Sequence, residues 1–154
     1  MYQKFYQIML IRILLFISAT LSISTLSAQM EVEWSTLMDV NFKDIYLESE
    51  DIYVYYPLFD EKHKKLDSQE IEITGYIIPL DVEANMYFLS AYPFSACFFC
   101  GNAGPESVMA VNFAGNNRRY NTDERITLKG ILNLNDSDVD ELIYILNQAT
   151  EVPK

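Results

Sequence analysis

The sequence has few of the residues on which several common kinds of site depend. Its 154 residues include one histidine and two cysteines, and 11 lysines and arginines stand against 22 acids. One histidine excludes any site that needs two or more histidine ligands from a single chain. The formal charge of -11 excludes wrapping of a nucleic-acid backbone, because that affinity comes from clustered lysine and arginine.

Linker-like composition is also absent. Glycine and proline occur five times each, and no segment is repeated or rich in proline, glycine or serine. Half of the residues are hydrophobic and 14% are aromatic, so the chain is too apolar to stay disordered. At this length we expect one compact domain over residues 29–154.

A long apolar run occurs only near the N-terminus. Residues 1–28 carry Lys4 and Arg12 and no acid, followed by an apolar stretch from Ile13 and small or polar residues up to Ala28. This layout predicts a secretory signal peptide. The alternative is an N-terminal membrane anchor, but the apolar stretch is short for a hydrocarbon layer of about 30 Å.

Cleavage near Ala28 would change the charge of the protein. It would leave 126 residues with 9 basic and 22 acidic side chains, a formal charge of -13. We expect an exported protein, periplasmic or extracellular, with no stable membrane insertion after cleavage. Its charge favours cations, metal ions or basic proteins as partners.

The pattern of residues 29–154 predicts a small barrel. Residues 29–50 are expected to form an N-terminal arm, either a short helix or an extended segment. Gly75 and Gly130 interrupt two strongly alternating strands, as tightly curved barrels require. Strands and helices do not alternate, so a doubly wound parallel sheet is disfavoured. We expect a mostly β (α+β), five-stranded OB-like barrel, with strands over residues 51–57, 70–80, 85–92, 107–113 and 125–134.

Two segments are predicted to be helical. Residues 59–66 would form two turns with Phe59, His63 and Leu66 on one face. Residues 137–149 are expected to form a C-terminal packing helix that Ser137 caps. Its apolar stripe would contain Val139, Leu142, Ile143, Leu146 and Ala149.

The chemical signature of the sequence is Cys97-Phe-Phe-Cys100, in a loop between two expected strands. This spacing brings two sulfurs within reach of one metal ion or of each other. Two thiolates and two further ligands complete a tetrahedral zinc site, and thiolates also suit Cu(I). His63, Glu106 and Asp81 are available as further ligands, as is the same cysteine pair from a second subunit.

Two other interpretations of the cysteine pair stay open. A thiol–disulfide redox site is the one enzymatic candidate, but Gly101, Gly104 and Pro105 stand where thioredoxin-like proteins continue into a long helix. A structural disulfide within an interaction module is permitted by export. Its short loop would give little stabilisation.

Other polar residues favour simple structural roles. His63 lies among charged neighbours in residues 61–65, which predicts a solvated side chain. Arg118 and Arg119 are expected to be a charge pair at a hairpin end rather than an anion site. No hydroxyl–histidine–acid arrangement is indicated.

Three segments together resemble a known family. They are Leu66–Leu80 with its Gly-Tyr-Ile-Ile-Pro-Leu ending, the cysteine loop, and Ile126–Leu134. They resemble an uncharacterised family of small exported bacterial proteins, a domain of unknown function, over residues 34–149. The resemblance implies an OB-like fold and a link to metal handling or envelope transport. Many relatives carry one cysteine followed by a histidine and a proline run, where this chain has Cys-Phe-Phe-Cys-Gly.

We therefore predict an exported, non-enzymatic binding protein with a soft-metal site at Cys97, Cys100, His63 and Glu106. Zinc is the first expectation and copper the second. The partner would be a metal ion or an envelope protein, and the sequence does not specify the oligomeric state.

Overall fold

The computed structural model describes residues 2–3, 30–94, 104–115 and 117–153. Cys97 and Cys100, and all but two residues of the expected signal peptide, lie outside the described residues. The barrel strands are β4 (Gln69–Asp81), β5 (Met86–Ser90), β6 (Val108–Phe113), β7 (Glu124–Leu134) and β8 (Tyr144–Glu151).

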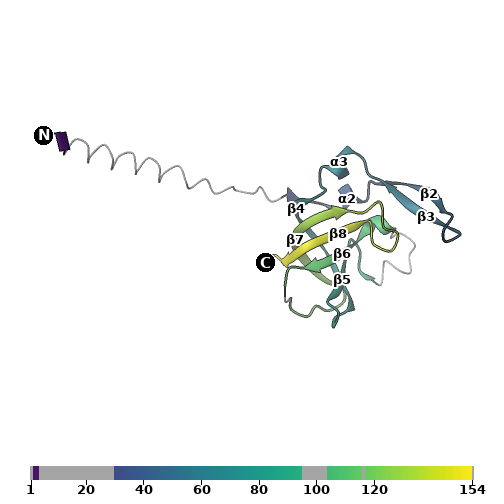
Figure 1. The fold of residues 1–154 in the computed structure, drawn as a ribbon. Helices are drawn as coiled ribbons and strands as arrows, with labels where there is room; N and C mark the ends of the chain where they lie inside the picture. The colour runs from purple at the N-terminus through teal and green to yellow at the C-terminus, as the bar shows by residue number, and fades with distance from the viewer. Residues whose placement is uncertain (1, 4–29, 95–103, 116, 154) are drawn as a thin grey trace.

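These five strands form a closed, mixed β-barrel (Figure 1). Their order is β4-β5-β6-β8-β7, and β7 pairs again with β4 to close it. β6 and β8 run parallel, whereas the other neighbours are antiparallel. The expectation of a mostly β, five-stranded barrel is confirmed.

Alternating side chains of the strands fill the barrel. The expected inward faces of β4 and β7 are confirmed, with Ile71, Ile73, Ile77, Ile126, Leu128 and Leu132 all buried. Gly75 lies where β4 and β5 approach closely, because a Cβ there would lie 2.7 Å from the carbonyl oxygen of Ser90. The backbone approach therefore requires glycine at this position.

The expected C-terminal helix over residues 137–149 is wrong, because residues 135–143 form a loop and the chain from Tyr144 onward belongs to β8. Pairing with both neighbours shows one extra residue on β8, between Leu146 and Ala149. Gln148 there has a φ of 53°. This bulge turns both Leu146 and Ala149 inward at a spacing of three residues. Apolar residues three positions apart are typical of a helix. This spacing explains why the sequence pattern predicted a helix here.

The loop before β8 begins at Asn135 rather than at the predicted cap Ser137. The side-chain oxygen of Asn135 accepts hydrogen bonds from the backbone N–H groups of Ser137 (3.2 Å) and Asp138 (2.9 Å). Its amide donates to the carbonyl oxygen of Asp138 at 2.7 Å. Val139, expected in the core, is half exposed in this loop.

Short elements cover one end of the barrel. They are α2 (Trp34–Leu37), α3 (Glu61–Lys64) and the 3-10 turn η1 (Pro105–Ser107). The two-residue strand β1 (Met30–Glu31) pairs in parallel with β4. The indole N–H of Trp34 donates to the carbonyl oxygen of Thr74 at 2.9 Å, and α2 packs against η1. Within the described part of the chain, every helix is too short to cross a membrane.

A hairpin stands out from the barrel (Figure 1). Its strands are β2 (Asn41–Leu47) and β3 (Ile52–Leu58), which pair with each other in a separate sheet. β3 confirms a strand over residues 51–57, but this strand lies outside the barrel, whose fifth strand is β8. The segment expected as an arm thus contains both a short helix, α2, and an extended strand, β2.

Candidate functional site

His63 is completely buried, so the expectation of a solvated histidine is wrong. Asp60 caps α3 by accepting from the backbone N–H groups of Lys62 and His63. Phe59, His63 and Leu66 all pack toward the barrel, but the two helical turns expected over residues 59–66 are reduced to the single turn of α3, with Phe59 before its cap and Leu66 after its end. The packing of this segment against the barrel therefore decides the burial of His63, although its neighbours in the sequence are charged.

The imidazole of His63 is held by a carboxylate. Its Nδ1 lies 2.7 Å from the Oδ1 atom of Asp60. Desolvation opposes ionisation of this carboxyl, but the hydrogen bonds from the backbone and ring of His63 prevail and lower the pKa of Asp60. The other ring nitrogen, Nε2, is buried and has no hydrogen-bond partner among the described residues.

Tyr144 lies beside this pair. The ring of Phe59 is 5.9 Å from the ring of His63 and 5.8 Å from that of Tyr144. Burial raises the pKa of Tyr144, and the charges of Glu106 and Asp60 raise it further. Both carboxylates therefore act electrostatically on the same hydroxyl.

Glu106 is placed at this end of the barrel by η1. Pro105 begins the turn, and the hydroxyl of Ser107 donates to the carbonyl oxygen of Gly104 at 2.7 Å. The turn follows the cysteine segment directly in the sequence. The structure thus brings Glu106 and the Asp60–His63 pair to the surroundings of Tyr144.

Asp81, another expected ligand, lies elsewhere. Asp81 accepts from the N–H groups of Glu83 and Ala84 in the turn after β4. Cys97 and Cys100 lie outside the described residues. No group of three or more histidine, cysteine, aspartate or glutamate side chains within the described ranges is placed to hold a metal ion. A complete site here needs donors from the cysteine segment.

Arg118 forms ion pairs, in line with its expected structural role. Its guanidinium lies 2.5 Å from the carboxylate of Glu124 and 2.8 Å from that of Glu151. The hydrogen bonds from Arg118 lower the pKa of Glu151. With two carboxylates bound, this guanidinium has little capacity for an external anion.

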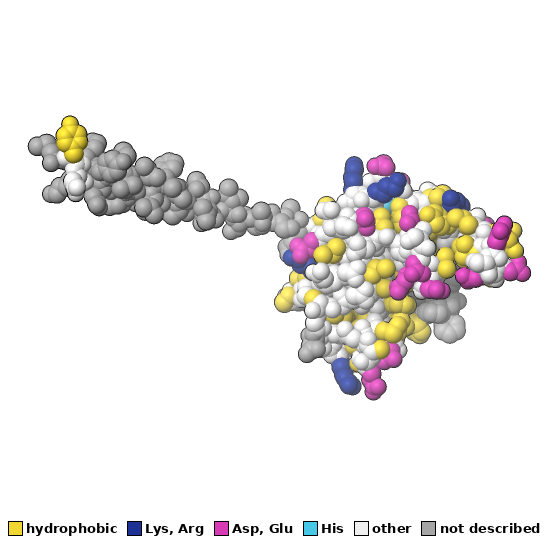
Figure 2. Space-filling view, viewed as in Figure 1, with side chains coloured by type: hydrophobic (Ala, Val, Ile, Leu, Met, Phe, Trp, Pro, Cys, Tyr) yellow, Lys and Arg dark blue, Asp and Glu magenta, His cyan; other side chains and the backbone are white. Residues whose placement is uncertain are grey.

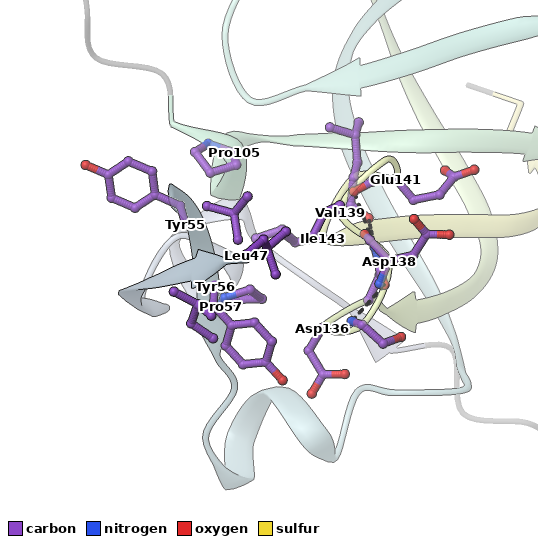
Figure 3. Close-up of a pocket in the computed structure, with 15 residues that line it drawn as sticks. Leu47, Tyr55, Tyr56, Pro57, Pro105, Asp136, Asp138, Val139, Glu141 and Ile143 are labelled. Atoms are coloured by element: carbon purple, nitrogen blue, oxygen red, sulfur yellow. Dashed lines mark hydrogen bonds between the residues drawn. The ribbon is translucent and has the colours of Figure 1, made fainter. Parts of the chain in front are cut away.

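A groove that the sequence did not predict lies between the hairpin and the loop before β8. It has a volume of about 410 Å³. The hairpin contributes Leu47, Tyr55 and Tyr56. The loop on the opposite side contributes Asp136, Asp138, Val139 and Glu141, and Pro105 lies at one end (Figure 3). The one sequence signal for this groove was the row of tyrosines in β3. A simple alternation of buried and exposed residues does not account for it.

Comparison with known proteins supports the fold alone. No family model matches the chain, and no curated protein matches it. The structure is similar to the crystal structure of a DUF3299 family protein from Pseudomonas aeruginosa, with a TM-score of 0.51 and 19% identity. The match covers 82% of this chain and 98% of that chain. DUF3299 denotes a domain of unknown function, so the expected resemblance is supported in fold.

Proposed function

We propose that this is an exported binding protein that holds a soft metal ion, zinc before copper. Cys97 and Cys100 would supply two thiolates, His63 an imidazole nitrogen and Glu106 a carboxylate oxygen. The buried imidazole of His63, held through its Nδ1 by the exposed carboxylate of Asp60, carries this proposal. Histidines that bind metals commonly donate their other ring N–H to a carboxylate, which orients the ring.

The energetics of His63 also support a cation. A buried polar atom without a partner costs about 1–3 kcal/mol of stability, and the Nε2 atom of His63 is such an atom among the described residues. A metal ion at Nε2 would remove that cost. Four protein ligands would fill a tetrahedral zinc site, which favours a binding or structural role over catalysis.

The barrel supports an OB-like assignment within this proposal. Its strand order closes β7 on β4, with β6 and β8 parallel. OB barrels commonly place ligands on loops and on one strand face. The net charge of -11 argues against an oligonucleotide as that ligand.

Metal content tests the proposal. Protein expressed from the full-length gene and purified under reducing conditions should carry about one zinc per chain, with ligand thiols deprotonated. A C97S/C100S variant should lose the metal, and His63→Gln and Asp60→Asn should weaken its retention against a chelator. Glu61→Gln, an exposed change in the same helix, is the control. Less than about 0.2 metal per chain, without thiol-dependent uptake of Zn(II) or Cu(I), would overturn the proposal.

The groove favours a second candidate, an interaction module in which Cys97 and Cys100 form a structural disulfide. It predicts fully oxidised cysteines and partner binding that a chelator does not change. One native mass spectrum that counts bound metal and free thiols separates the two candidates. A thiol oxidoreductase would additionally require a cysteine with a lowered pKa.

A further inference from the structure

We propose that the groove between the β2–β3 hairpin and residues 135–143 docks a lysine- or arginine-rich segment of a partner polypeptide. This inference goes beyond the metal site and does not depend on it. None of the groove residues is a proposed metal ligand.

The floor of the groove is apolar. Ile45 and Leu47 of β2 face it together with Val54 of β3, and all three are half-buried. Ile143 adds to this floor from the end of the loop before β8, and Val139 is half exposed at the rim. Its volume of about 410 Å³ lies within the usual range of binding sites. Such a floor receives aliphatic side chains of a partner.

The rim of the groove is acidic. Three of the 15 lining residues are Asp136, Asp138 and Glu141, all exposed, and none of the 15 is lysine or arginine. No described residue forms an ion pair with these three carboxylates. Figure 2 shows acidic and hydrophobic side chains interspersed over the hairpin and the adjoining barrel surface. Complementary charge would come from a basic partner.

Tyrosine rings on the hairpin add a second preference for cations. The ammonium group of Lys43 lies 4.8 Å from the centre of the Tyr56 ring, so that ring is engaged by a cation of the chain itself and Tyr55 is the ring that would meet a partner. The side chain of Tyr55 lines the groove and is 73% exposed. Aromatic faces attract lysine and arginine, most strongly where water is excluded.

The occupant is inferred to be a polypeptide of another protein. Within the described chain, β3 pairs with β2 alone, so its outer backbone edge is available for strand addition by an extended segment. A second copy of this chain is disfavoured, because two acidic grooves on molecules of charge -11 repel each other.

Fluorescence anisotropy tests the inference with a labelled peptide of alternating lysine and leucine. The protein expressed from the full-length gene should bind it more tightly than the matched glutamate–leucine and lysine–serine peptides. The D136N/D138N/E141Q variant should weaken binding about tenfold, since three exposed charge pairs are removed. The charge-matched control is E31Q/E61Q/E83Q, whose three acids lie outside the groove.

The apolar contribution has its own pair of variants. Y55S/V139S should weaken binding, whereas Tyr53→Ser, equally exposed on the hairpin but outside the groove, should not. Equal loss in the groove and charge-matched control variants would overturn the inference. So would a dimer in sedimentation that the groove variants dissociate, or a groove filled by the protein's own residues 95–103 in an experimental structure.

Discussion

The hydroxyl of Tyr144 donates a 2.7 Å hydrogen bond to the backbone carbonyl of Leu37, 107 residues earlier in the chain. Both residues are fully buried. The bond joins β8 of the barrel to α2, which covers the barrel end. It thereby fixes the segment before the hairpin on the strand beside the candidate metal site.

Replacing Tyr144 by phenylalanine should therefore destabilise the protein by about 1–2 kcal/mol, because the buried carbonyl of Leu37 loses its donor. Urea unfolding followed by tryptophan fluorescence measures the change, since Trp34 lies in α2. Tyr55→Phe, which removes an exposed hydroxyl, is the control. Equal stability of the Tyr144 variant and the unmodified protein would contradict this role for the bond.

Alanine substitutions at Gly75 and Gly115 form a second pair of test variant and control. A Cβ at Gly75 would lie 2.7 Å from the carbonyl oxygen of Ser90, whereas a Cβ at Gly115 meets none of the described residues within 4 Å. Gly75→Ala should lower the free energy of unfolding by about 1–3 kcal/mol, because β4 and β5 must separate. Gly115→Ala should change it by less than about 0.5 kcal/mol. Thermal unfolding of both variants checks the difference.

The Glu151–Arg118 ion pair predicts a pH dependence in the acid range. Hydrogen bonds from Arg118 hold the pKa of Glu151 below its usual value of 4.5. Its contribution to stability is present above pH 4.5 and is lost as the pH falls through the lowered pKa of the folded state. Both side chains are partly exposed, so the contribution is below about 1 kcal/mol.

Thermal unfolding between pH 3 and 7, a range of about four units around the carboxylate pKa, should therefore show a flatter acid limb for Glu151→Gln. Glu61→Gln is the control, because Glu61 forms an exposed pair with Lys64 at 3.7 Å. Identical acid limbs for Glu151→Gln and the unmodified protein would exclude this contribution.

The strands with regular alternation were predictable, because their buried apolar residues recur at every second position of the sequence, as Ile71 and Ile73 do. The bulge in β8 was not, since an extra residue changes the local spacing from two to three. The position of Leu146 between β6 and β7 depends on partners that lie far away in the sequence. Local patterns therefore favoured a helix where tertiary pairing makes a strand.

The candidate site was predictable in its residue types but not in its environment. The charged neighbours of His63 favoured exposure, while the packing of Phe59 and Leu66 turned the histidine inward. The spacing of three residues between Asp60 and His63 could have indicated that Asp60 orients the imidazole. The groove could not be predicted, because it joins the hairpin to a loop about 80 residues later.

The position of β8 also constrains how the chain folds. β8 inserts between β6 and β7, which are not paired with each other in the described structure. Until residues 144–151 have been synthesised, β6 and β7 each keep an unsatisfied edge, and the barrel has no closed form. A chain that lacks this strand would therefore leave the barrel open.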